Sequence, residues 1–298
     1  PLTIVKPVEI TRGCNQPPKP PFAVRVNASG GLSVKMGMLR KLVLAFVAAL
    51  TASMPVAANA SRVSPMILEL EPTGRAAIAR VQLTNDGVND IPFEVQMMRG
   101  TISEDGILSL EPADEDFLVF PTQAIVEANS QQVFRMQYVG SATLDRSEIY
   151  YMSIRQVPVD FEEGTTQVQV VVNYNVLANV VPEGTRPEPV VRSARYLEAE
   201  PAVVSEPADG DEAAPADGPF TGVEVDIANN GNRYFLAGFG TFTISGTTGG
   251  QTFEQVFTRD DLAKLIGVGV VAPGRNRKFR LPLNTSPDEG SLRVELQL

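Results

Sequence analysis

Acidic residues are the most abundant groups in this chain that could do chemistry. The sequence has 35 Asp and Glu residues, and Asp114, Glu115 and Asp116 stand together directly before an apolar stretch. Two carboxylates can act as the acid and base of a hydrolase, and a cluster of them can bind calcium. Most of the acidic residues fall in turn-like segments, where solvated charge is the simpler interpretation. A carboxylate hydrolase therefore remains one open alternative, without a defined site.

The other residue types that support catalysis are absent or isolated. The chain has no His and a single Cys, Cys14, so Ser-His-Asp and Cys-His catalysis are excluded and the commonest zinc ligand is missing. The glycine-rich stretch ISGTTGG (244–250) lacks the lysine and the following helix of a phosphate-binding loop, which favours a hairpin turn. No set of catalytic or metal-binding residues therefore stands out in the sequence, and we expect no cofactor.

Residues 36–60 have the three parts of a secretory signal peptide. Arg40 and Lys41 precede the apolar run 42–50, and Ala58-Asn59-Ala60 fits an A-x-A cleavage site. The apolar run is well short of the roughly 20 residues that span a membrane, so we do not expect a membrane-embedded protein. Residues 1–35 show no periodicity and are predicted to be an unstructured extension. Because the chain starts at Pro1, we expect translation to begin at Met36 or Met38.

The segment after the predicted cleavage site is strongly acidic. The whole chain has 25 basic and 35 acidic residues, and residues 1–60 hold seven basic residues and one acidic residue. Residues 61–298 therefore carry 18 basic and 34 acidic side chains, a net charge of −16. A surface of this sign does not favour nucleic acid or anionic membranes as partners.

Short alternating stretches separated by turn signals run from residue 61 onward, which predicts an all-β protein. Residues 61–182 suit one immunoglobulin-like sandwich, with a hairpin turn at Asp105-Gly106. Residues 183–298 predict a second, smaller β-sandwich with one short helix over 258–267, capped by Thr258. The stretch 197–219 is rich in Ala, Pro, Asp and Glu and is predicted to be a flexible acidic insertion.

The longest alternating stretch is TTQVQVVVNYNVLANV, at residues 165–180. A valine or tyrosine occupies every second position from Val168 to Val176. This period of two predicts a long strand with one strongly apolar face. Such a face can cover the domain's own core, or it can be offered to another chain, and periodicity alone leaves both alternatives open.

Several motifs, in the same order along the chain, resemble those of the PapD-like periplasmic pilus-assembly chaperones, and most closely the archaic chaperone–usher branch. The segment LDRSEIYYMSIRQVP (144–158) is similar to the family's turn and aromatic strand, with the last two turn residues swapped. The other similar segments are VSPMILEL (63–70), VQLTNDG (81–87), FLVFPTQAIVEANSQQVFRMQY (117–138), VDIANNGNRYF (225–235) and VVAPGRNRKFRLPL (270–283).

The resemblance implies two immunoglobulin-like domains set at an angle, located in the periplasm. It also implies a non-enzymatic chaperone that lends a strand to pilus or fimbrial subunits and delivers them to an outer-membrane usher. The donor strand would be the stretch 165–180. Its subunit-binding residues would be Val168, Val170 and Val172, with Tyr174 at the boundary where the strand joins the chaperone's own core.

The resemblance also implies roles for three charged residues. Arg135 and Glu148 match family positions that join in an interdomain salt-bridge cluster. The basic pair that anchors the subunit's terminal carboxylate is missing, because Ile67 and Leu177 occupy the expected positions. Arg155, on the preceding strand, is the candidate substitute. The alternative from another functional class is a secreted two-domain β-sandwich adhesin or binding module, for which the stretch 165–180 would be internal.

Overall fold

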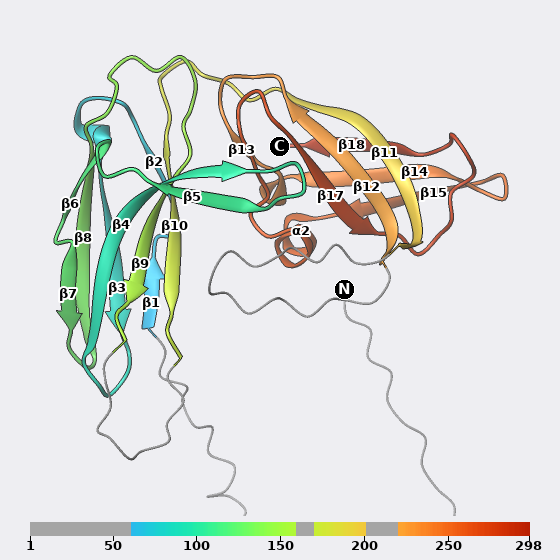
Figure 1. The fold of residues 1–298 in the computed structure, drawn as a ribbon. Helices are drawn as coiled ribbons and strands as arrows, with labels where there is room; N and C mark the ends of the chain where they lie inside the picture. Colours follow the sequence, from blue (N-terminus) through green and yellow to red (C-terminus); the bar gives the residue numbers. More distant parts are fainter. Residues whose placement is uncertain (1–60, 159–169, 201–219) are drawn as a thin grey trace, which may run out of the picture. The chain divides into compact units, whose positions relative to one another are not determined.

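The computed structural model describes residues 61–158, 170–200 and 220–298, which fold into two β-sandwiches (Figure 1). The predicted all-β architecture is confirmed, because helix in these ranges is limited to two 3-10 turns and one short α-helix. Both sandwiches belong to one compact unit. The predicted N-terminal extension, signal peptide and most of the acidic insertion (201–219) lie outside the described residues.

The first sandwich packs a four-stranded sheet, in the order β1-β3-β8-β6, against a six-stranded sheet. The larger sheet has the order β2-β10-β9-β4-β5, and β7 also pairs with β4. The strands are β1 (Ser61–Ser64), β2 (Ile67–Leu70), β3 (Ile78–Asn85), β4 (Ile91–Ile102), β5 (Leu108–Pro112), β6 (Phe117–Phe120), β7 (Gln123–Val126), β8 (Ser130–Tyr138), β9 (Tyr150–Gln156) and β10 (Asn173–Val180), with the 3-10 turn η1 at Arg75–Ala77.

Alternation along the strands builds the core of this sandwich. In β8, Phe134, Met136 and Tyr138 are buried, whereas Val133 and Arg135, which alternate with them, are exposed. Successive side chains of a strand point to opposite faces, so this pattern directs one face of β8 to the opposite sheet. Each fully buried large apolar side chain contributes about 1.5–3 kcal/mol. The alternation of apolar and polar residues in the sequence therefore matches the alternation of buried and exposed side chains in the structure.

The predicted hairpin turn at Asp105-Gly106 is confirmed. β4 and β5 pair antiparallel from Met98 with Pro112 to Ile102 with Leu108. Gly106 has a backbone φ of +89°, which lies in the left-handed region that favours glycine. The tip of this hairpin contacts the second sandwich, because the Lys278 N–H donates to the Glu104 carbonyl at 2.7 Å.

The second sandwich contains a three-stranded sheet β11-β12-β17, a second three-stranded sheet β15-β14-β18 and the short pair β13-β16. Its core includes Val225, Phe242, Ile244 and Phe279. The elements are β11 (Pro189–Glu200), β12 (Phe220–Asn229), β13 (Phe235–Leu236), η2 (Ala237–Phe239), β14 (Thr241–Thr248), β15 (Gln251–Phe257), α2 (Arg259–Leu265), β16 (Val270–Val271), β17 (Asn276–Pro282) and β18 (Arg293–Gln297).

The predicted helix over 258–267 is confirmed as α2, with Thr258 as its N-cap. The Asp261 carboxylate accepts hydrogen bonds from the Thr258 backbone N–H at 2.9 Å and from its hydroxyl at 2.7 Å. These hydrogen bonds hold the pKa of Asp261 below its ordinary value. A carboxylate in the first turn also faces the positive end of the helix dipole. Leu262 is fully buried and fixes the helix to the core.

The start of the predicted acidic insertion was wrong. β11 extends to Glu200, so residues 197–200 belong to a strand. Leu197 is buried because β11 continues to pair with β12 there, opposite Gly222. An apolar residue next to acidic ones thus marks a core position of the strand.

Glu224 on β12 lies in register between Arg195 on β11 and Arg280 on β17. Burial raises the pKa of Glu224, but hydrogen bonds from both arginines, each at 3.2 Å, outweigh it and hold the pKa below its ordinary value. A carboxylate with a lowered folded-state pKa stabilises the fold above its unfolded pKa, and this contribution is lost as the pH falls through the folded pKa.

We therefore expect Glu224→Gln to lower the free energy of unfolding by about 1 kcal/mol at pH 7. The difference from the parent protein should shrink as the pH is lowered towards about 3, because the unfolded chain, in which Glu224 has its ordinary pKa, then takes up a proton more readily than the folded protein does. Urea unfolding at both pH values measures this. Glu295→Gln, at an exposed position on β18, is the matched control. A loss that is the same at both pH values would contradict the ionic origin of the effect.

Candidate functional site

The main-chain edge of β10 is the first feature of the candidate site. On one side, β10 pairs antiparallel with β9 from Asn173 to Leu177. On the other side, it pairs in parallel with β2 only from Leu177 to Val180. Within the described part of the chain, Asn173–Val176 therefore has a strand on one side only. An open edge of this kind presents unpaired N–H and C=O groups that another strand can bind.

The apolar side chains at alternate positions of residues 170–176 change from exposed to buried along the chain. Val170 is 72% exposed, Val172 and Tyr174 are half-buried, and Val176 is 0% exposed. Val176 packs into the core of the first sandwich, and Tyr174 packs partly against the same core. The Tyr174 hydroxyl also hydrogen-bonds to the Ser61 carbonyl. Val168 lies outside the described residues. These apolar side chains are thus buried in the core at Val176 and exposed to solvent at Val170.

Within the described residues, the strand is shorter than the stretch 165–180 over which it was predicted. β10 begins at Asn173, and Val170–Val172 are not in a strand. The partner strand β9 ends at Gln156, whose backbone N–H donates to the Val172 carbonyl at 3.0 Å. No described strand lies beside the chain before Val172, so the backbone hydrogen bonds between β9 and β10 end there.

Arg155, the predicted carboxylate anchor, lies on β9 in register with Asn173 at the start of β10. Its Nε forms an ion pair with the Glu94 carboxylate at 3.2 Å. Both side chains are well exposed, at 52% and 39%, so the pair is worth about 0–1 kcal/mol. Arg155 is close to the open edge, but its charge already has a partner.

Ile67 and Leu177, which occupy the positions of the missing basic pair, lie together in register on β2 and β10. Both belong to an apolar cluster that we call the contact cluster. Its buried members are Ile149, Tyr151, Leu177, Val181, Tyr234 and Val270, from both sandwiches. The positions of the missing basic pair therefore lie in a largely buried apolar cluster.

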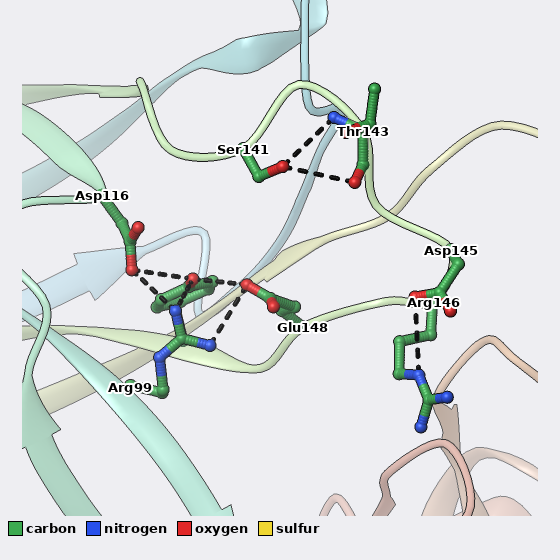
Figure 2. Close-up of polar contacts among 8 residues, drawn as sticks. Arg99, Asp116, Ser141, Thr143, Asp145, Arg146 and Glu148 are labelled. Atoms are coloured by element: carbon green, nitrogen blue, oxygen red, sulfur yellow. Dashed lines mark hydrogen bonds and ion pairs between the residues drawn. The ribbon is translucent and has the colours of Figure 1, made fainter.

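Glu148 belongs to a compact charged network within the first sandwich (Figure 2). Arg99, near the end of β4, reaches Asp116 at 2.7 Å and Glu148 at 3.2 Å. The Tyr150 hydroxyl accepts from Arg99 and donates to Glu148, each at 2.6 Å. Burial and the hydrogen bond to Glu148 raise the pKa of Tyr150 far above its ordinary value, so this phenol stays protonated. One guanidinium thus compensates two carboxylates.

The predicted pairing of Arg135 with Glu148 is wrong. Arg135 is on the exposed face of β8, in register with Arg80 on β3, and it forms no ion pair with a described residue. The alternation that buries Phe134 and Met136 turns Arg135 outward. Arg99 takes its place beside Glu148. The sequence offers little local signal for Arg99, because its partners come from other strands.

Asp114, Glu115 and Asp116 do not form a site. Asp116 pairs with Arg99, Asp114 accepts a hydrogen bond from Gln96 at 3.0 Å, and Glu115 is exposed. In the described ranges, no group of three or more acidic, His or Cys side chains is placed to hold a metal ion. None of the helices in these ranges has the length and apolar character that crossing a bilayer requires.

Other residues join the two sandwiches. Arg233 donates to both carboxylate oxygens of Glu69, at 2.8 and 2.7 Å, and the Tyr234 hydroxyl donates to Glu69 at 2.6 Å. The Tyr234 backbone N–H donates to the buried Ser147 hydroxyl at 2.7 Å. The turn 145–148 thus supplies Ser147 to this contact, next to the predicted Glu148. Glu69 and Arg233 form the interdomain ion pair that was predicted for other residues.

A comparison with protein families matches part of the chain. Residues 69–185 match the family described as "Pili and flagellar-assembly chaperone, PapD N-terminal domain". This range includes β10, its open edge, Arg99 and Glu148. The resemblance to the pilus-assembly chaperones is therefore confirmed over residues 69–185, which make up most of the first sandwich. No curated protein matches the chain.

Solved structures of pilus chaperones are also similar to this chain. One is the class 5 fimbriae chaperone CfaA, with 12% identity over 80% of this chain and 99% of that chain, at a TM-score of 0.44. A chain of the Salmonella enterica SafA pilin–SafB chaperone complex has 17% identity over 75% and 85%, at 0.42. A chain of the archaic CsuC–CsuE complex of Acinetobacter baumannii has 11% identity over 74% and 90%, at 0.42. Both identity and TM-score are low, so these likenesses add no argument about function.

Proposed function

We propose that this protein is a periplasmic chaperone that binds and stabilises pilus or fimbrial subunits by donating a strand, and that it delivers them to an outer-membrane usher. The observation that carries the proposal is the open edge at Asn173–Val176, preceded along the chain by the exposed Val170. This edge lies inside the segment that matches the pilus-chaperone family. The role is non-enzymatic and requires no cofactor.

The physical reason for the role is complementarity between two incomplete structures. A sandwich that lacks its last strand exposes an apolar groove and an unpaired edge, and both promote aggregation. A donated strand forms main-chain hydrogen bonds with that edge, and its alternate side chains fill the groove. Val168, Val170 and Val172 would fill the groove of the subunit. Tyr174 would mark the end of the donated segment, because its ring also packs on the chaperone's own core.

Arg155 fits this proposal as a charged neighbour of the donated segment. To bind a subunit carboxylate, its guanidinium would have to release Glu94. The exposed pair is weak, so this exchange would cost about 1 kcal/mol or less.

Co-expression with a fimbrial subunit from the same operon tests the function. We expect a stable one-to-one complex that can be purified from the periplasm, and an aggregated subunit when the chaperone is left out. Size-exclusion chromatography with mass measurement gives the stoichiometry. If the subunit is equally soluble alone and no complex forms, the chaperone function is wrong, and an adhesin or binding module becomes the better description.

A further inference from the structure

Two arginines from different sandwiches, Arg146 and Arg275, line one cavity of about 230 Å³. Both side chains are exposed, so a dissolved molecule can reach them. Arg146 belongs to the turn 145–148 of the first sandwich, and Arg275 ends the turn 272–275 of the second. A Cβ at Gly274 would lie 3.8 Å from the Arg146 Nη1 atom. The two positive side chains therefore come from adjoining turns.

Within the described ranges, these two positive charges have little compensation. Arg146 pairs with its neighbour Asp145 at 3.7 Å, but both side chains are well exposed, at 60% and 88%, so this ion pair contributes little. Arg275 is exposed and forms no ion pair with a described residue. Like charges on adjoining turns repel each other, and an anion between them would reverse that repulsion.

The other charged side chains of the lining, Arg99 and Glu148, are already bound to each other. The Arg99 Nη1 lies 3.2 Å from the Glu148 Oε2, which also accepts a hydrogen bond from Tyr150 at 2.6 Å. Among the described residues that line the cavity, Glu148 is the only carboxylate. Figure 2 shows Arg146 apart from this network. Arg146 and Arg275 therefore carry the positive charge that is available to a ligand.

Backbone hydrogen bonds hold both turns in place. The Gly274 N–H donates to the Asn229 carbonyl at 2.8 Å, and the Ser147 N–H donates to the Asn232 carbonyl at 2.9 Å. Both turns are thus fixed to the end of β12 and the residues that directly follow it. A ligand bound there orders two side chains and no loop, which keeps the entropic cost of binding low.

We infer that Arg146 and Arg275 bind a phosphate group, with one guanidinium from each sandwich. Guanidinium groups give phosphate oxygens charge-assisted hydrogen bonds, and a dianion balances both arginines, whereas a carboxylate has a single charge. The cavity, at about 230 Å³, is several times larger than the roughly 30 Å³ that a water molecule occupies, so phosphate fits with bound water. The phosphate is a free ion or part of a larger molecule, and the site does not depend on the proposed function.

Titration of the isolated protein with inorganic phosphate at constant ionic strength tests the inference. Calorimetry should show one saturable site, and the melting temperature should rise as the site fills. Arg146→Gln and Arg275→Gln should each weaken binding about tenfold or more, because each removes a charged donor. Arg293→Gln, at an exposed position on β18, is the matched control and should bind as the parent protein does.

Two results would overturn the inference: acetate that binds as tightly as phosphate, or phosphate binding that neither Arg146→Gln nor Arg275→Gln weakens. Arg146 also lines a second cavity together with Arg186, so Arg186→Gln should leave binding unchanged. A loss with Arg186→Gln but not with Arg275→Gln would refute the site. Glycerol 3-phosphate distinguishes the two sources. Binding about tenfold tighter than that of inorganic phosphate supports a phosphorylated molecule as the ligand, and equal or weaker binding supports the free ion.

Discussion

The Val170→Asp variant is expected to lose the complex with its fimbrial subunit while it remains folded. Val170 is 72% exposed in the free protein, so aspartate should change the free energy of unfolding by less than about 0.5 kcal/mol. In the subunit groove, the change removes about 1.5–3 kcal/mol of apolar burial and adds the cost of desolvating a charge. We therefore expect affinity to fall by a factor of at least about 100.

Val88→Asp is the matched control for this variant. Val88 is 71% exposed, and it lies in the turn between β3 and β4, outside the donated segment. Both variants make the same chemical change at the same exposure, so only position distinguishes them. Co-purification of the subunit and thermal unfolding of each free variant are the two measurements. A complex that survives Val170→Asp, or that is lost equally with Val88→Asp, would show that the donated segment lies elsewhere.

The Arg99→Met variant is expected to be the most destabilised of the charge variants considered. Without Arg99, the half-buried carboxylates of Asp116 and Glu148 face each other, and the Tyr150 hydroxyl has one hydrogen to share between them. Removing one partner of a buried charge network costs about 3–5 kcal/mol. Partial exposure of these side chains reduces the expected loss to about 2 kcal/mol. The melting temperature should fall by roughly 4–8 °C.

Arg135→Met separates this network from the pairing that the sequence suggested. It removes the same charge from an exposed position without an ion pair among the described residues, so its effect should stay within about 0.5 kcal/mol. Adding Glu148→Gln to Arg99→Met should restore part of the lost stability, because it removes one of the two facing charges. The interaction energy of this double-mutant cycle is the measurement. Purely additive losses would show that Arg99 acts through packing rather than charge.

Local features of this fold could be predicted because a few neighbouring residues determine them. The alternation Phe134-Arg135-Met136 fixes which face of β8 is buried. The spacing of Thr258 and Asp261 fixes the start of α2. The Thr258–Asp261 contact joins groups three residues apart, and the alternation in β8 assigns its faces within a few positions, so a short stretch of sequence is enough to predict each feature.

Pairings between distant strands could not be predicted in the same way. Arg99, Asp116 and Glu148 come from three separate segments of the chain. They meet only because β4 pairs with β9 and because the start of β6 lies near β4. The start of β10 depends on where β9 ends, at Gln156, and not on the valines themselves. Arg277 meets Gly106 only because the β4–β5 hairpin reaches the second sandwich. The family resemblance located the apolar stretch of interest, but it could not identify these partners.

The burial of Val176 has a consequence for what the open edge can accept. Val176, Ala178 and Val180 lie in the core, so β10 cannot slip by one residue without turning Asn175 and Leu177 into it. The core therefore fixes which residues of the β10 edge point to each face of the sheet, before any partner binds. A strand added there must place its apolar side chains at matching parity, and a partner whose alternation is offset by one would present polar groups instead. The edge thus selects partner strands by the register of their alternating apolar and polar residues.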